Sequence, residues 1–221
     1  SRVRAMSAPV DHDPFLDGFA EFAHAEASRH PAMADAMGVL VDALGACTPL
    51  GGGPQPTYPV VDEHLGPCLD AVVGAPGELL RLVADRIGWA IPYAEHAGES
   101  DMDHMRANYA YAPIVGTNPI SSGGLEEPFP LYASADVFAG AVVQGPGVTY
   151  PSHVHKATET FWVAAGTADW QMGDEWTSRG PGATIFHPTG TRHATVTTDE
   201  PQLMLFAWTS DPDCVPVIIR F

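Results

Sequence analysis

Helical and strand-like spacings of apolar residues divide the chain near residue 114. In the alanine-rich segment 13–47, Phe15, Phe19 and Phe22 recur at helical spacing, which is typical of the buried face of an amphipathic helix. Pro31 interrupts this segment, so we expect two helices rather than one.

A glycine- and proline-rich stretch, residues 48–59, breaks regular structure after these helices. A second helical pair is predicted beyond it, because apolar residues again share one face of each segment: Leu65, Leu69 and Val72, then Leu79, Leu80, Leu82 and Val83. Residues 1–113 are therefore expected to form a helical extension that packs on the C-terminal half of the chain.

From about Ile114 onward, short apolar runs alternate with Gly, Pro, Asn and Asp, which is typical of strands joined by turns. The strand candidates are residues 138–144, 160–165, 168–172, 183–187, 193–197 and 203–208. They predict a small antiparallel barrel built from two sheets over residues 114–221.

The charge of the chain bears on its binding partners, and its cysteine content bears on the compartment in which it acts. The formal net charge is −17 with only 10 Lys and Arg, whereas a nucleic-acid phosphate backbone needs a basic face, so no nucleic-acid partner is expected. No apolar run approaches the roughly 20 residues of a membrane helix, and the first residues lack the apolar core of a signal peptide. Three cysteines without CxxC spacing favour reduced thiols and a cytoplasmic protein.

Four residues have the spacing of metal ligands: His153, His155, Glu159 and His193. Their nitrogen and oxygen donors suit one divalent transition metal ion, either Zn, Fe, Mn, Co or Ni. On a strand, alternate side chains share a face, so His153 and His155 can reach the same ion. His193 follows a Pro-Thr-Gly turn and would come from a neighbouring strand. His187 lies beside that turn and could support a ligand.

These residues resemble the two motifs of the cupin superfamily. The first motif is matched at every spacing by Gly147, His153, His155, Glu159 and Gly166, and the second by Gly182, Pro188, Gly190 and His193, with Thr197 in place of its final Asn. The resemblance implies an α+β, mainly β fold: a single cupin barrel, which is a double-stranded β-helix or jelly roll, preceded by an N-terminal helical region.

Within the cupins, residues 107–210 resemble the dimethylsulfoniopropionate lyase family. Tyr150, three residues before His153, and Trp208, fifteen residues past His193, carry this likeness together with the runs AGTADW and HPTGTRHA. Members usually have a tyrosine two residues past the metal-binding Glu, where this chain has Phe161. A phenyl ring can neither ligate nor accept a proton. Either Tyr150 carries the base role alone or the chemistry is altered.

The resemblance implies a metal-dependent carbon–sulfur lyase that cleaves dimethylsulfoniopropionate to dimethyl sulfide and acrylate. A metal bound to the substrate carboxylate would stabilise the charge that develops when Tyr150 removes the α-proton. An aromatic wall suits the sulfonium cation, and its candidates are Trp208, Trp162 and Tyr150. The expected substrate-binding residues are Trp208, Trp162 and Phe161. Trp162 alternates with Phe161 on opposite faces of the strand, which favours core packing for Trp162. Tyr93, Tyr109 and Tyr111 could lie over the barrel mouth, with no role assigned.

Two other functions stay open. Phe161 also suits a metal cupin that acts on another small carboxylate as an oxygenase or isomerase, and the same barrel could bind a small molecule without turnover. In each case the expected partner is a small zwitterionic or carboxylate compound, and the expected state is a monomer or homodimer.

Overall fold

The computed structural model describes residues 13–220, apart from residues 52, 54 and 118–127. Its helices are α1 (Pro14–Arg29), α2 (Ala34–Ala46), α3 (Pro59–Asp70), α4 (Gly74–Arg81) and α5 (Ser100–Ala107), with short 3-10 turns η1 (Pro31–Met33) and η2 (Ala94–His96). Asp13 caps α1 by accepting from the backbone N–H groups of Phe15 and Leu16. Within the described part of the chain, no helix combines the length and the apolar character needed to cross a bilayer.

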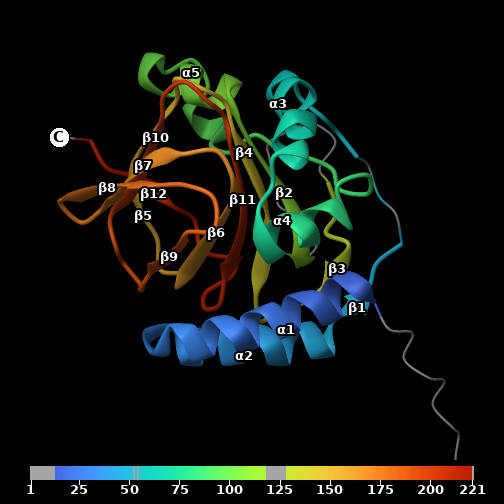
Figure 1. The fold of residues 1–221 in the computed structure, drawn as a ribbon. Coiled ribbons are helices and arrows are strands. Elements are labelled where there is room, and N and C mark those ends of the chain that lie inside the picture. Colours follow the sequence, from blue (N-terminus) through green and yellow to red (C-terminus); the bar gives the residue numbers. More distant parts are fainter. Residues whose placement is uncertain (1–12, 52, 54, 118–127, 221) are drawn as a thin grey trace, which may run out of the picture.

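Two facing sheets form the barrel (Figure 1). The larger sheet has the order β1-β3-β2-β4-β11-β6-β9, and the smaller has the order β12-β5-β10-β7-β8. The strands are β1 (Thr48–Pro49), β2 (Tyr109–Gly116), β3 (Tyr132–Ala133), β4 (Phe138–Gln144), β5 (Thr149–Val154), β6 (Glu159–Ala165), β7 (Ala168–Met172), β8 (Glu175–Arg179), β9 (Thr184–His187), β10 (His193–Thr197), β11 (Gln202–Trp208) and β12 (Val217–Ile218). This is the expected jelly-roll architecture.

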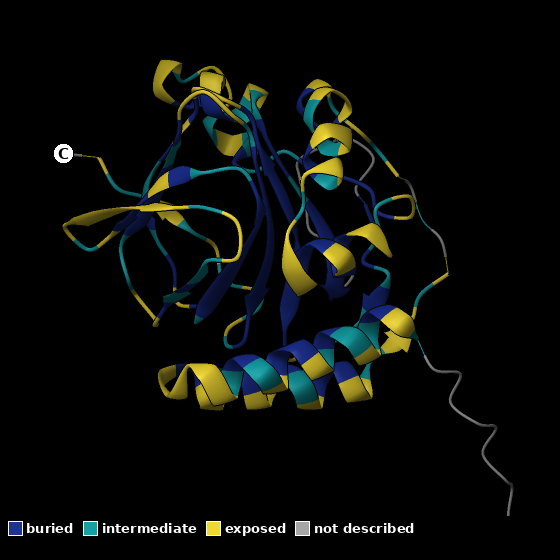
Figure 2. Cartoon of the chain, viewed as in Figure 1, coloured by how far each residue is buried: buried dark blue, intermediate teal, exposed yellow. Residues whose placement is uncertain are grey.

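The central strands of the larger sheet, β2, β4, β11 and β6, are buried on both faces. Along β11, Leu203, Leu205 and Ala207 pack with the helices, whereas Met204 and Phe206 face the barrel interior. Helices α1 and α2 lie together across one end of the sheet, and α3 and α4 cover its outer side (Figures 1 and 2). The two cores that result are separated by the sheet itself, which explains why these strands read as continuous apolar runs.

Most predicted elements are confirmed. The segment before residue 47 forms two helices on either side of Pro31, and the second helical pair is α3 and α4. Strands β4, β7 and β10 have the predicted bounds, and β6, β9 and β11 differ by one residue. The prediction lacked the helix α5, the short strands β1, β3 and β12, the exposed β8, and β2, which begins at Tyr109 and pairs with β4. The expected boundary after residue 113 thus falls inside a strand.

Residues of the two motifs also shape the turns of the barrel. Gly166 has φ +75°, and a Cβ there would come 1.9 Å from the carbonyl oxygen of Pro201, so no other residue fits. Thr197, at the position of the motif's Asn, donates through Oγ1 to the carbonyl of Gly145 at 2.6 Å and accepts from the N–H of Val148 at 3.0 Å. The threonine therefore fastens the turn before β5 without approaching the metal ligands.

Candidate metal centre and active-site cavity

A cavity of about 410 Å³ opens between the two sheets. Eight of its 22 lining residues are Phe, Tyr or Trp, and its mouth is formed by residues 91–95 on one side and by the C-terminal segment 212–216 on the other. Arg220 bonds to Glu99 and Asp101, which ties the end of the chain to the start of α5 beside the mouth. The size and enclosure suit a small molecule rather than a polymer.

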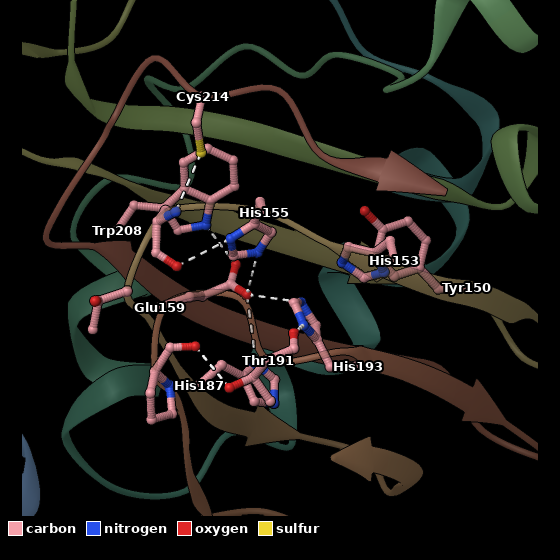
Figure 3. A network of polar contacts seen from close by, with 12 residues as sticks. Tyr150, His153, His155, Glu159, His187, Thr191, His193, Trp208 and Cys214 are labelled. Atoms are coloured by element: carbon pink, nitrogen blue, oxygen red, sulfur yellow. Dashed lines mark hydrogen bonds and ion pairs between the residues drawn. The ribbon is translucent and has the colours of Figure 1, made fainter. Parts of the chain in front are cut away.

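Strand pairing brings the predicted ligands together (Figure 3), and three of them, His153, His155 and Glu159, line this cavity. His153, near the end of β5, pairs in register with His193, the first residue of β10, and their ring centroids lie 4.0 Å apart. His155 follows β5 directly, and its ring lies 4.9 Å from that of His193. Glu159 begins β6 in the opposite sheet. All four side chains are buried.

Each of the three clustered imidazoles is oriented by a backbone carbonyl two residues away. The Nδ1 atoms lie 2.9 Å from the oxygen of Pro151 for His153, 3.1 Å from that of Ala157 for His155, and 2.8 Å from that of Thr191 for His193. A carbonyl only accepts, so each Nδ1 carries the proton and donates it. In the neutral imidazole Nε2 then keeps a free lone pair, which is the form that binds a metal.

The carboxylate of Glu159 faces these lone pairs. Its Oε2 lies 3.1 Å from Nε2 of His155 and 3.0 Å from Nε2 of His193, while its Oε1 accepts from Nε1 of Trp208 at 2.6 Å (Figure 3). Two acceptors at such distances repel unless a proton or a cation lies between them. The arrangement therefore has the form of a cation site.

Protonation supports the same conclusion. Burial, helped by the neighbouring His193, lowers the pKa of His153 well below its usual value, so this imidazole is neutral at neutral pH. Burial raises the pKa of Glu159, but the nearby imidazoles of His155, His187 and His193 outweigh it and hold that pKa well below its usual value. An ionised carboxylate close to the neutral imidazole of His153 fits a divalent transition metal ion.

A second group of donors overlaps the first. The ligand atoms of His153, His155 and His193 lie within 4.8 Å of one another, and so do those of Glu159, His187 and His193. His187 is the last residue of β9, and its Nδ1 lies 3.5 Å from Oε2 of Glu159. Burial, opposed by Glu159, lowers the pKa of His187 to about 4.

Tyr150 lies on the cavity wall beside the cluster. Its ring meets the edge of the His153 ring with centroids 4.3 Å apart and stacks on Tyr109 at 4.8 Å. Its hydroxyl is hydrogen bonded to that of Tyr93 at 2.7 Å. Burial, with added repulsion from Tyr93 and Tyr109, raises the pKa of Tyr150 well above its usual value.

The other predicted site residues divide between the two cores. Trp208 and Phe161 line the cavity, as expected. The expectation for Trp162 is corrected: its side chain lies on the opposite face of β6, where Nε1 donates to Glu26 at 3.0 Å and the ring packs against Phe19. Alternation along the strand places Phe161 and Trp162 on opposite faces, so only one of them can reach the cavity.

Some cavity residues had no role assigned from the sequence. Tyr93 belongs to the loop before α5 and has φ +60°, a left-handed conformation that a bulky residue adopts only where its surroundings hold it. Phe138, Phe206 and Cys214 also line the cavity. In the sequence, Phe138 and Phe206 were marked only as members of apolar runs, and Cys214 was not marked at all. The contact of Cys214 with the cavity depends on how the C-terminal segment returns over the barrel.

Comparisons with known proteins agree with this geometry. The family model described as dimethylsulfoniopropionate (DMSP) lyase matches residues 32–204. A curated relative, the DMSP lyase DddQ of Ruegeria pomeroyi, is 39% identical over 88 residues, which cover 39% of this chain and 44% of that protein. The matched region thus spans less than half the length of the curated relative.

Solved structures extend the likeness to nearly the whole chain. The crystal structure of DddQ from Ruegeria pomeroyi superposes with a TM-score of 0.67 at 24% identity, covering 94% of this chain and 97% of that one. A structure from a study of the DMSP lyases RdDddP and RnDddQII gives 0.62 at 18% identity, covering 93% and 98%. At these identities the likeness establishes the shared fold, including the helices that precede the barrel.

Proposed function

The chain belongs to the DMSP lyase family, and from this premise we propose that it cleaves DMSP to dimethyl sulfide and acrylate in a metal-dependent β-elimination. One observation carries the proposal: the phenol of Tyr150 lies on the wall of the cavity, against a buried cluster of three histidines and one glutamate. The cavity therefore places a potential base next to a potential Lewis-acid site.

The two ends of the substrate match the two ends of the cavity. Its carboxylate suits the histidine cluster, and its sulfonium suits aromatic rings, since a cation over a ring face gains roughly 0.5 to 2 kcal/mol. Phe138, Phe206 and Trp208 supply such a wall, with Phe138 edge-on to Trp208 at 5.6 Å. Glu95 and Asp213 also line the cavity and add negative potential near its mouth. We therefore place the sulfonium against these rings, toward the mouth.

The chain's own residues account for the proton transfer. Tyr150 takes the proton from the carbon next to the carboxylate; the electron pair of that C–H bond forms the double bond of acrylate, and the pair of the C–S bond leaves with neutral dimethyl sulfide. A bound metal supplies Lewis-acid stabilisation of the carboxylate and favours the phenolate of Tyr150 over the phenol. That help is needed because burial raises the pKa of Tyr150. The Tyr93 hydroxyl can donate to the phenolate oxygen.

Phe161 limits the choice of base. It lines the cavity within the same aromatic cluster as Trp170 and Phe206, and its ring cannot exchange protons. We therefore assign the base role to Tyr150 alone. Phe161 also supports the second candidate function, a metal cupin that oxidises or isomerises another small carboxylate.

The finer properties are proposals as well. We propose one divalent ion held by His153, His155, Glu159 and His193, with zinc or iron as the leading candidates. Cys47, Cys68 and Cys214 are free thiols, which supports a reducing compartment and hence the cytoplasm. We propose that the protein acts as a monomer or homodimer.

The test measures dimethyl sulfide in the headspace and acrylate in solution from protein loaded with Zn²⁺ or Fe²⁺ and supplied with DMSP. Tyr150→Phe and Glu159→Ala should each lower the rate at least a hundredfold, the scale of a lost general base. Tyr58→Phe is the matched control, because Tyr58 lies outside the cavity at the start of α3. A wild-type rate no higher than that of the two site variants would reject the lyase. Oxygen uptake with the iron form would instead favour the oxygenase.

A further inference from the structure

We propose that His187 is itself a ligand of the metal ion, binding it together with Glu159 and His193. This inference rests on the metal binding in the proposed function and concerns a residue outside the four-ligand set assigned above. The donor atoms of Glu159, His187 and His193 lie within 4.8 Å of one another in a fully buried group. They form a second donor triad that shares His193 with the first.

Strand pairing fixes His187 at this position. It lies directly opposite Glu159 in the antiparallel pairing of β6 with β9, so the two side chains project to the same face of the sheet. The imidazole stacks on that of His193 with centroids 4.1 Å apart and planes 27° apart. Its Nδ1 comes within 3.5 Å of Oε2 of Glu159 (Figure 3). The ring is therefore held against two metal ligands by the fold itself.

His187 differs from the other three histidines in its hydrogen bonding. Each of those donates Nδ1–H to a backbone carbonyl, whereas neither ring nitrogen of His187 has a hydrogen-bond partner of good geometry within the described part of the chain, although the residue is only 1% exposed. Buried polar groups are normally satisfied. Phe161 and Trp170, whose rings lie 6.2 Å away, offer no acceptor. A cation at Glu159 would satisfy the free imidazole nitrogen.

The two triads must hold one ion between them. The Nδ1 of His193 is engaged by the carbonyl of Thr191, so His193 has only Nε2 to offer. His153, His155 and Glu159 line the cavity, whereas His187 does not. His187 would therefore bind the ion from a side that does not line the cavity. This leaves coordination positions toward the cavity for a substrate.

The test counts imidazoles around Co²⁺, used as the probe ion, from the hyperfine-shifted exchangeable N–H signals in the proton NMR spectrum. His187→Phe keeps a ring among the apolar neighbours but removes both donor atoms. We expect it to lose one shifted signal and to bind Co²⁺ at least tenfold more weakly in competition with a chromophoric chelator, since loss of even an outer partner of a metal site costs 10- to 100-fold. His24→Gln, on the exposed face of α1, should match wild type in both measurements.

His187→Gln separates a ligand from a simple hydrogen-bond partner of Glu159. Glutamine can donate to a carboxylate but has no imidazole nitrogen. If His187 is a ligand, the Gln variant binds Co²⁺ as weakly as the Phe variant. An unchanged signal count in His187→Phe, or restored affinity in His187→Gln, overturns the inference while the metal centre stands. Absence of Co²⁺ binding by the wild type would instead overturn the metal centre and this inference together.

Discussion

The hydroxyl groups of Tyr93 and Tyr150 lie 2.7 Å apart on the cavity wall, and this hydrogen bond joins the loop before α5 to strand β5. Tyr93 holds the left-handed backbone conformation that makes the contact possible. The carbonyl of Pro92, just before it, accepts from Nε of Arg106 at 3.1 Å, which fastens the loop to α5. A residue with a strained backbone, Tyr93, thus holds the phenol of Tyr150, which we assign as the base.

Tyr93→Phe should lower kcat about tenfold with little change in KM. A hydrogen bond to a charged oxygen contributes about 1.5 kcal/mol, and each 1.36 kcal/mol of barrier is a factor of ten. The ring remains, so substrate packing is kept. Steady-state kinetics of dimethyl sulfide release measures the effect, with Tyr58→Phe as the control. Equal kcat values for wild type and Tyr93→Phe would show that the contact does not assist the base.

Trp208→Phe should weaken metal binding roughly 10- to 100-fold, because the indole Nε1 donates to Oε1 of Glu159 at 2.6 Å and orients that carboxylate. Metal content after dialysis against a graded chelator series measures the loss. Trp176→Phe is the matched control, since Trp176 is 49% exposed on β8. If both variants retain metal equally, the hydrogen bond has no part in ligand orientation.

Glu26→Ala should destabilise the fold by about 3 kcal/mol. This carboxylate is 2% exposed, and it accepts from Nε1 of Trp162 at 3.0 Å and from Oγ1 of Thr184 at 2.7 Å, which fastens α1 to the larger sheet. Removing it leaves the buried indole N–H of Trp162 and the half-buried hydroxyl of Thr184 without this partner. Urea unfolding of the variant measures the loss, and Glu21→Ala, exposed on the same helix, serves as control. A difference below about 1 kcal/mol would contradict the assigned role.

How far the sequence predicts this site depends on the kind of contact. The spacing of His153 and His155 sufficed because strand geometry is regular, and the pairing of β5 with β10 brings His193 to them. Alternation separates Phe161 from Trp162 but cannot say which one faces the cavity, because β6 is buried on both faces. Tyr93 lies 57 residues before Tyr150, and their contact depends on a left-handed loop residue that no local pattern announces. Strand β8 escaped prediction because all five of its residues are exposed.

The metal-free protein should lose stability as the pH falls from about 6.5 toward 4. Burial lowers the pKa of His187 from 6.5 to about 4, so within this window the unfolded chain binds a proton that the folded chain does not. Stability therefore falls with decreasing pH, and His187 accounts for about 3 kcal/mol over the full window, or about 2 kcal/mol at pH 5. His153 acts in the same direction because its pKa is also lowered.

Urea unfolding in excess chelator at pH 7 and pH 5 measures this fall in stability. His187→Phe carries no such group, so it should lose about 2 kcal/mol less than wild type between these two pH values. Parallel losses in the two proteins would mean that His187 takes up its proton as readily in the folded chain as in the unfolded one.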